Sequence, residues 1–199
     1  MHFLESAAEN LGTVPWDRLP AVVWLLIALA LAFDFLNGFH DSANSVATVV
    51  STRVLSPGMA VLWAAFFNFI AFLIFHLRVA DTMGKDIIDP NVVDNRVIAA
   101  TLIAACFWDV LTWYWGLPTS SSHALVGGLM GAGLMQAGTA ALRWDGIGTT
   151  AAFIVLAPLL GMLTGLAIMV AVLWLFRRAT PRHVDHLFRR GQLVSASLY

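Results

Sequence analysis

The chain has 199 residues, of which 59% are hydrophobic and 12% charged, and its formal net charge is -1. Lys, Arg, Asp and Glu are missing from residues 58–77 and 146–176. This composition excludes a soluble globular domain and indicates an integral membrane protein. The single cysteine, Cys106, excludes a disulfide within the chain and a cysteine-rich metal site. We expect no cofactor and no resident metal.

Apolar segments of membrane-spanning length recur along the chain. Five of them reach or approach the roughly 20 residues that a spanning helix needs: residues 20–36, 58–77, 97–115, 119–137 and 149–176. They are expected to be helices, because open strands leave backbone groups unpaired in lipid. The predicted fold class is therefore an all-α integral membrane protein with about five transmembrane or re-entrant helices.

The parts outside these segments are predicted from charge. Residues 1–19 form an N-terminal extramembrane segment before the membrane region 20–176, within which residues 79–95 and 137–148 are predicted solvated loops. Residues 177–190 hold five of the eleven Lys and Arg, so the positive-inside rule places this predicted loop in the cytoplasm. Residues 191–199 are interpreted as the start of a further span that the chain end interrupts, and the chain is expected to be truncated.

The first apolar segment runs into the polar sequence NGFHDSANSVAT. Asp34, Asn37, Asp41, Asn44 and Thr48 follow one another at spacings of three and four residues, which keeps them on one helix face. A helix from residue 21 to 52 would be about 48 Å long, against a hydrocarbon core of about 30 Å. The segment is thus expected to project from the membrane or to break, most naturally at Gly38.

A charged residue near the bilayer centre costs at least about 2.5–3.5 kcal/mol, which argues for a use. The polar stripe predicts a cation or proton site, because carboxylate and amide oxygens can replace the hydration shell of an ion and a desolvated Asp can carry a proton. The alternative for Asn44, Ser45 and Thr48 is hydrogen bonding between helices. His40 either relays protons or lies at the membrane interface.

A second polar stretch is YWGLPTSSSHALVGGLMGAGL, residues 114–134. Pro118 suits the first turn of a helix, and neighbouring hydroxyls can cap its free amides. Such a helix start presents amide hydrogens, a positive dipole end and hydroxyls, which together predict an anion site. The candidate ligands are Thr119, Ser120, Ser121, Ser122 and His123. The alternative is a cytosolic loop followed by an ordinary packing helix.

Small residues and one further acid complete the pattern. Gly127 and Gly131 have the Gly-x-x-x-Gly spacing, which predicts close approach of another helix. Asp109 lies between apolar neighbours and shares a helix face with Thr112. An acid in that setting needs a partner or a proton, so Asp109 is a further candidate for cation or proton coupling.

Together, NGFHDSANSVATVV and GLPTSSSHALVGG, in that order, resemble the N-terminal half of the inorganic phosphate transporter (Pit) family. The resemblance implies phosphate symport with protons or sodium, an inverted repeat and a substrate site near the membrane midplane. It implies that Asp41 and Asn44 coordinate ion and phosphate, and that Ser120, Ser121 and Ser122 hold phosphate. The sequence GFHD, residues 38–41, is similar to that of the bacterial proton-coupled branch of the family. Asp109 departs from the family pattern, because relatives often have Asn at this position.

The resulting hypothesis is inorganic phosphate transport across the cytoplasmic (inner) membrane by cation symport, with the proton as the expected driver. Asp34, Asn37, Asp41, Asn44 and Asp109 would couple the cation, and phosphate could travel with a metal ion. The expected partners are phosphate, a proton or sodium ion, the lipid bilayer and the second half of the transporter; a homodimer is left open. The alternatives are a carrier of another oxyanion such as sulfate, a sodium-coupled carrier and, most remotely, an intramembrane hydrolase, for which no Gly-x-Ser-x-Gly motif is present.

Overall fold

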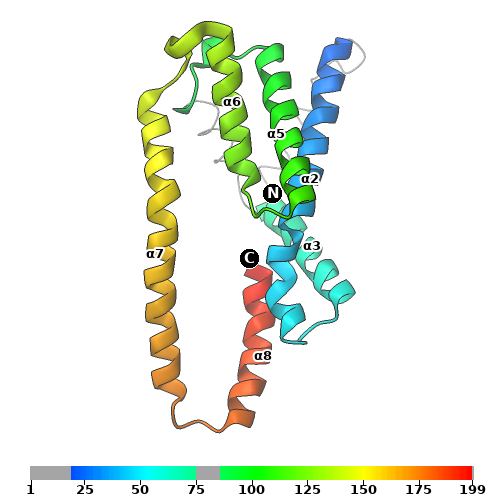
Figure 1. Ribbon diagram of the computed structural model, residues 1–199. Helices are drawn as coiled ribbons and strands as arrows, with labels where there is room; N and C mark the ends of the chain where they lie inside the picture. The colour runs from blue at the N-terminus through cyan, green and yellow to red at the C-terminus, as the bar shows by residue number, and fades with distance from the viewer. Residues whose placement is uncertain (1–18, 75–85, 199) are drawn as a thin grey trace. The chain divides into compact units, whose positions relative to one another are not determined.

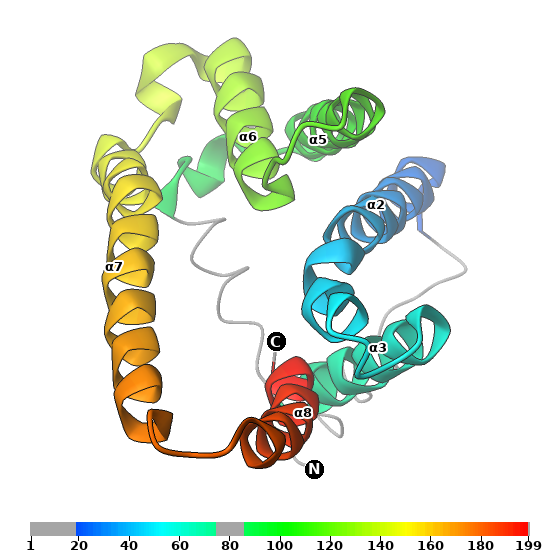
Figure 2. The same cartoon turned by 60° about the horizontal axis from the view of Figure 1, so that its bottom comes forward.

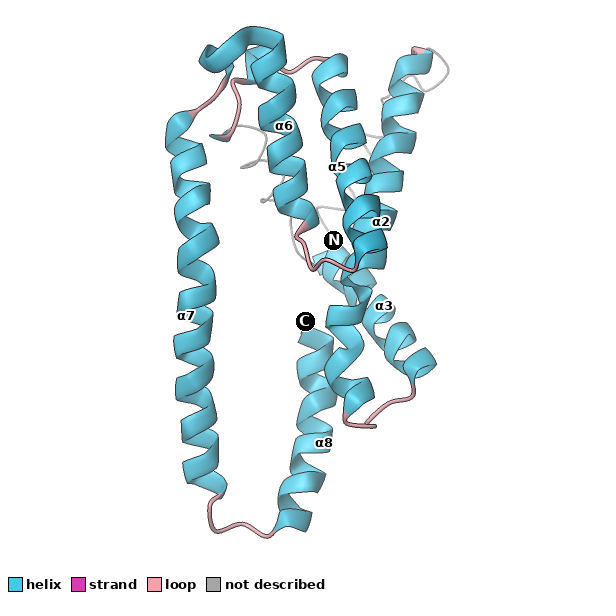
Figure 3. Ribbon diagram, in the orientation of Figure 1, coloured by secondary structure: helices cyan, strands magenta, loops and turns pink. Residues whose placement is uncertain are grey.

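The computed structural model describes residues 19–74 and 86–198, and helices make up most of them (Figure 1). Within these residues the β structure is limited to one isolated bridge between Ile88 and Leu142. Four of the described helices are long and apolar enough to cross a membrane. The predicted all-helical membrane fold is therefore confirmed (Figure 3).

The first polar stripe lies on one uninterrupted helix. Helix α2 runs from Ala21 to Ser51, a length of about 46 Å at 1.5 Å per residue. The break expected at Gly38 is thus wrong: helical hydrogen bonding continues through this glycine. The helix ends where Arg53 takes a left-handed φ of 55°, and the Thr52 hydroxyl donates to the Thr48 carbonyl oxygen at 2.7 Å. The following helix α3 spans Pro57–Ile74, and residues 75–77 of the predicted segment 58–77 lie outside the described residues.

Helices α5 (Asn95–Trp115) and α6 (Ser121–Ala137) form an antiparallel hairpin, side by side in both views (Figures 1 and 2). The Asp94 carboxylate caps α5 by accepting from the amides of Arg96 and Val97, both at 2.9 Å. Its second oxygen accepts from Gln136 Nε2 at 3.3 Å, which joins the start of α5 to the end of α6. At the other end of the hairpin Gly116, with φ of 65°, terminates α5.

A small hydrophobic core lies beside the C-terminal end of α6. Ile88 is fully buried there with Val97 and Ala141, and the short helices η2 (Pro90–Val92) and η3 (Gly138–Ala141) flank it. Ile87 is also buried, at 3% exposure. The prediction of a solvated loop over residues 79–95 is therefore wrong for Ile87 and Ile88, because two large apolar side chains in an acidic segment gain by leaving water; residues 79–85 lie outside the described residues.

The last two helices are α7 (Trp144–Phe176) and α8 (Pro181–Leu198). Helix α7 is about 50 Å long and buries none of its residues within this chain, as expected for a helix that contacts lipid or further membrane segments. The sequence predicts a loop over the basic stretch 177–190, yet only residues 177–180 of this stretch are non-helical. Residues 191–198, the predicted start of a further span, form the C-terminal part of helix α8.

The helices divide between two compact units. One contains α5, α6 and α2 as far as His40, and the other contains α7, α8, the rest of α2 and most of α3. The serine-rich helix start and Asp109 belong to the first unit, whereas Asp41 and Asn44 belong to the second.

Candidate functional site

The start of α6 is capped by the hydroxyl-rich sequence. Ser120 is the N-cap residue, with an extended backbone (φ -106°, ψ 118°), and its hydroxyl oxygen accepts from the His123 amide at 3.4 Å. The expectation that Pro118 occupies the first turn is wrong, because the left-handed Gly116 and a bond from the Leu117 amide to the Thr112 carbonyl make residues 116–119 a turn. The first turn of α6 is thus Ser121–Ser122–His123, preceded by a serine cap.

The hydroxyls at this helix start have different environments. Thr119 Oγ1 donates to Thr112 Oγ1 at 3.0 Å, and the buried Thr112 donates in turn to the Trp108 carbonyl at 2.8 Å. Ser121 is 2% exposed, and its Oγ is buried without a hydrogen-bond partner. A buried unpaired hydroxyl costs about 1–3 kcal/mol. The Ser121 hydroxyl is therefore available to hydrogen-bond a ligand. The Thr119 hydroxyl already donates its proton to Thr112.

A groove of about 900 Å³ runs along the α5–α6 hairpin. Thr119, Ser120 and His123 line it near the tip of the hairpin, whereas Ser122 is exposed and does not line it. Arg96 lines its other end, twelve residues from Trp108, or about 18 Å along α5. No described Lys or Arg lines the groove near the serine cap, so the positive charge there is that of the helix end.

The glycines of α6 have two different roles. A Cβ on Gly128 would lie 2.9 Å from the Thr101 carbonyl oxygen of α5, and one on Gly133 would overlap Ile88. A Cβ on Gly127 or Gly131 would meet nothing within 4 Å, and both glycines line the groove. Close packing therefore uses Gly128 and Gly133, and the predicted Gly127–Gly131 pair faces open space in this chain.

The α2 stripe carries the remaining candidates. Asp34, Asp41 and Asn44 are exposed on this chain and Asn37 is partly buried. Asn44 Nδ2 donates to Asp41 Oδ1 at 3.5 Å, so these two are neighbours as their spacing requires. The described residues hold no group of three or more His, Cys, Asp or Glu side chains that could bind a metal ion. A cation on this stripe would need amide oxygens besides carboxylates.

Asp109 is the one buried acid among the residues that the structure describes, at 1% exposure, and Thr112 on the same face is fully buried. A cavity of about 180 Å³ lies beside Asp109, between α5 and α2, and His40 also lines it. Phe39 closes one wall by packing on Trp113, with ring centroids 5.6 Å apart. The sequence leaves the role of His40 open. No sequence pattern predicts that His40 and Asp109 lie near each other, because they are 69 residues apart.

These features suit ion binding better than hydrolysis. Hydroxyls and amides at a helix start favour a tetrahedral oxyanion, and acids with amides favour a cation. The contact between Ser120 and His123 runs through the backbone amide. It is a helix cap and not the hydroxyl-to-imidazole hydrogen bond of an activated nucleophile.

Comparison with known proteins decides the family. A family model described as the phosphate transporter family matches residues 37–199. The chain belongs to the phosphate transporter family. It is 58% identical over 174 residues to a probable low-affinity inorganic phosphate transporter of Rhizobium meliloti, covering 87% of this chain and 52% of that protein. A protein of Bacillus subtilis with the same description is 41% identical over 184 residues, covering 92% of this chain and 55% of that protein.

A solved structure gives the same answer for the fold. The chain matches a structure titled "The sodium-dependent phosphate transporter" with a TM-score of 0.75 and 30% identity, covering 82% of this chain and 42% of that one. The family member described here thus spans about half the length of these relatives. Their descriptions are those of transporters, which move a solute and are not enzymes, and the chain itself is a membrane protein.

Proposed function

We propose that the protein carries inorganic phosphate across a membrane by symport with a cation. The observation that carries this proposal is the start of α6, where a serine cap and the buried, unpartnered Ser121 hydroxyl meet at a helix end within an apolar chain. Similarity to proteins described as phosphate transporters supports the choice of substrate. In the proposal Thr119, Ser120, Ser121, Ser122, His123 and Asn44 contribute to the phosphate site.

The charge of the substrate explains the need for a cation. Hydrogen phosphate is a dianion, while a helix end offers only about half an elementary charge. A cation bound nearby lowers the cost of bringing the dianion into a low-dielectric site. We propose that Asp34, Asn37, Asp41, Asn44 and Asp109 hold this charge, as a proton or a coordinated ion, so that driver and substrate bind together.

The proton is the proposed driver. Asp109 is almost fully buried, and a proton on its carboxyl group would avoid leaving a charge in that position. His40, on the wall of the same cavity, offers a second group that exchanges protons. The rival is sodium, which is supported by the similarity to a sodium-dependent transporter.

The remaining elements of the proposal concern the whole protein. Relatives about twice as long leave room for a second repeat of opposite orientation, which would complete a site near the membrane midplane. The bacterial relatives favour the cytoplasmic membrane as the location. The basic residues 177–190 then lie on the cytoplasmic side.

Uptake by the protein expressed from its complete gene tests the proposal. Purified protein in proteoliposomes is supplied with labelled phosphate under an imposed proton gradient, an imposed sodium gradient or neither. We expect uptake driven by the proton gradient and unaffected by excess sulfate. Uptake driven by sodium alone would replace the driver, competition by sulfate would widen the substrate class, and no uptake from folded, inserted protein would refute phosphate transport.

A further inference from the structure

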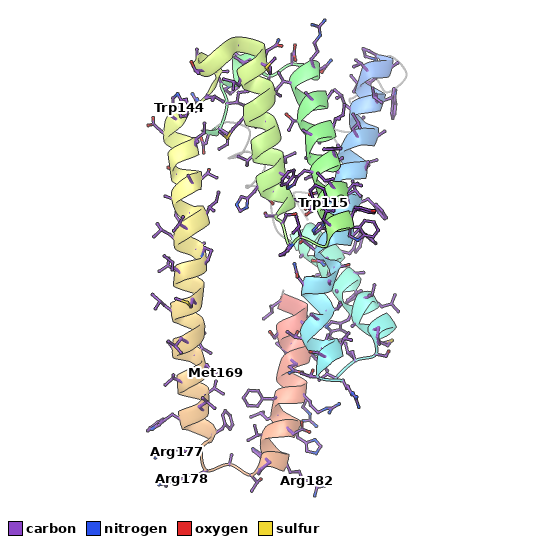
Figure 4. All side chains as sticks on the ribbon, in the orientation of Figure 1. Trp115, Trp144, Met169, Arg177, Arg178 and Arg182 are labelled. Carbon is purple, nitrogen blue, oxygen red and sulfur yellow. The ribbon has the colours of Figure 1, made fainter. Side chains whose placement is uncertain are left out.

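The turn between α5 and α6 contains a chain of hydroxyl hydrogen bonds. Thr112, in the last turn of α5, is fully buried, and Thr119, just before the Ser120 cap, lines the groove. Thr119 Oγ1 lies 3.0 Å from Thr112 Oγ1, which in turn lies 2.8 Å from the Trp108 carbonyl oxygen. Trp115, the last residue of α5, marks this end of the hairpin in Figure 4. The chain of bonds thus leads from the buried side of α5 to the groove.

The buried end of this chain fixes the direction of its hydrogen bonds. A carbonyl oxygen can only accept, so the contact with Trp108 uses the single proton of the Thr112 hydroxyl. The backbone carbonyl oxygen of Asp109, 3.2 Å from the same hydroxyl, is likewise only an acceptor. Thr112 Oγ1 therefore accepts from Thr119, and the Thr119 proton is directed at Thr112. The Thr119 hydroxyl is left with oxygen lone pairs as its means of binding a ligand.

Thr112 also fixes the backbone of the turn. Its carbonyl oxygen accepts from the Leu117 amide at 2.9 Å and from the Gly116 amide. Its side chain accepts from Thr119, so Thr112 contacts both the first and the last part of the turn 116–119. These contacts hold the Thr119 side chain in one position relative to the start of α6.

The neighbouring polar groups offer protons to a ligand, in contrast to Thr119. Ser120 uses an oxygen lone pair for the His123 amide, which leaves its hydroxyl proton for a ligand. The Ser121 hydroxyl is buried and has no hydrogen-bond partner. The first amides of a helix also lack acceptors within the helix. The start of α6 therefore combines several donors with one hydroxyl, that of Thr119, that can only accept.

We propose that Thr119 selects oxyanions that carry a proton, and that Thr112 is the positioning residue that makes Thr119 an acceptor. This inference rests on the proposed phosphate transport. Hydrogen phosphate has a hydroxyl that donates to Thr119 and ionised oxygens that accept from the serines. Sulfate is fully ionised near neutral pH, so it would place an oxygen lone pair against that of Thr119 and leave this acceptor unsatisfied. A helix end alone does not distinguish these two tetrahedral anions.

The test measures exchange of labelled for unlabelled phosphate in proteoliposomes that contain the protein expressed from its complete gene. Both sides are held at the same mildly alkaline pH, where phosphate and sulfate each carry two charges and differ in the proton. Selectivity is the inhibition of exchange by sulfate relative to that by unlabelled phosphate. Thr112→Val keeps the side-chain shape but frees the Thr119 proton to turn toward the groove. We expect this variant to gain sensitivity to sulfate, relative to phosphate, by roughly 5- to 150-fold.

Three further variants separate positioning from a general loosening of α5. Thr112→Ser keeps the hydroxyl and should keep the exclusion of sulfate. Thr119→Val removes the acceptor itself, so it should also lose selectivity, and it tests the proposal should Thr112→Val fail to fold. The matched control is Thr101→Val, because Thr101 is a second buried threonine of α5 whose hydroxyl donates to a carbonyl, that of Val97, at 2.8 Å. Thr101 lies about 17 Å along the helix from Thr112, so its replacement should leave selectivity unchanged.

The outcomes distinguish this inference from the proposed function. Absence of phosphate exchange by the folded wild-type protein would refute phosphate transport, and this inference with it. Exchange with the same selectivity in the wild type, Thr112→Val and Thr119→Val would overturn this inference alone. An equal loss of selectivity in Thr101→Val would overturn the positioning role of Thr112. A changed sodium dependence of Thr119→Val with unchanged selectivity would place a cation, and not the phosphate proton, at the Thr119 oxygen.

Discussion

Replacing Ser121 with alanine should make the ligand-free protein more stable and its phosphate affinity weaker. The Ser121 hydroxyl is buried and has no partner, so the ligand-free protein bears the cost of an unsatisfied polar group, about 1–3 kcal/mol. Ser121→Ala removes that cost, because alanine keeps the apolar contacts of the side chain. If phosphate is the missing partner, the same change removes a hydrogen bond to a charged group, which weakens binding by about 1–3 kcal/mol, or roughly 5- to 150-fold.

Two measurements on one purified variant separate these effects. Thermal unfolding in detergent without phosphate reports the stability, and titration with phosphate reports the affinity. Ser122→Ala is the matched control for stability, because Ser122 is the adjacent hydroxyl and is exposed. A lower melting temperature for ligand-free Ser121→Ala would show that the hydroxyl has a partner after all, and an unchanged phosphate affinity would move the phosphate site elsewhere.

Three further substitutions test the hairpin, the coupling and the small core. Gly128→Ala should be about 1–3 kcal/mol less stable than Gly127→Ala in a denaturant titration, because only the former places a methyl group against the α5 backbone; equal stabilities would contradict the packing. Asp41→Asn should abolish gradient-driven phosphate uptake in proteoliposomes, and near-normal uptake would remove this carboxylate from the mechanism. Ile88→Ala should cost about 2–5 kcal/mol of unfolding free energy, since the side chain is fully buried, and a change near zero would argue against that burial.

Much of this protein could be predicted from the sequence by itself. The membrane class follows from composition, because long apolar stretches without charge have no stable place in water. The stripe from Asp34 to Thr48 follows from helical periodicity, and the serine cap follows from the local chemistry of a helix start. Asn44 contacts Asp41, and Ser120 contacts the His123 amide. Both contacts join residues three apart, so the geometry of the helix backbone determines them.

Other features were decided only by tertiary structure. Which glycine of α6 packs depends on where α5 lies, so Gly128 and not Gly127 contacts Thr101. The burial of Ile88 depends on the end of α6 approaching a segment that reads as polar. Asp109 and His40 line the same cavity because α5 and α2, which are far apart in the sequence, pack against each other there.

Local sequence also misjudged continuity. Gly38 is a residue at which a helix can break, yet α2 continues through it. The charge of residues 177–190 predicts a loop, yet residues 181–190 of this stretch are helical. The charge of a segment indicates on which side of the membrane it lies. Its conformation depends on backbone hydrogen bonds and on the contacts that its apolar side chains make with neighbouring helices or lipid.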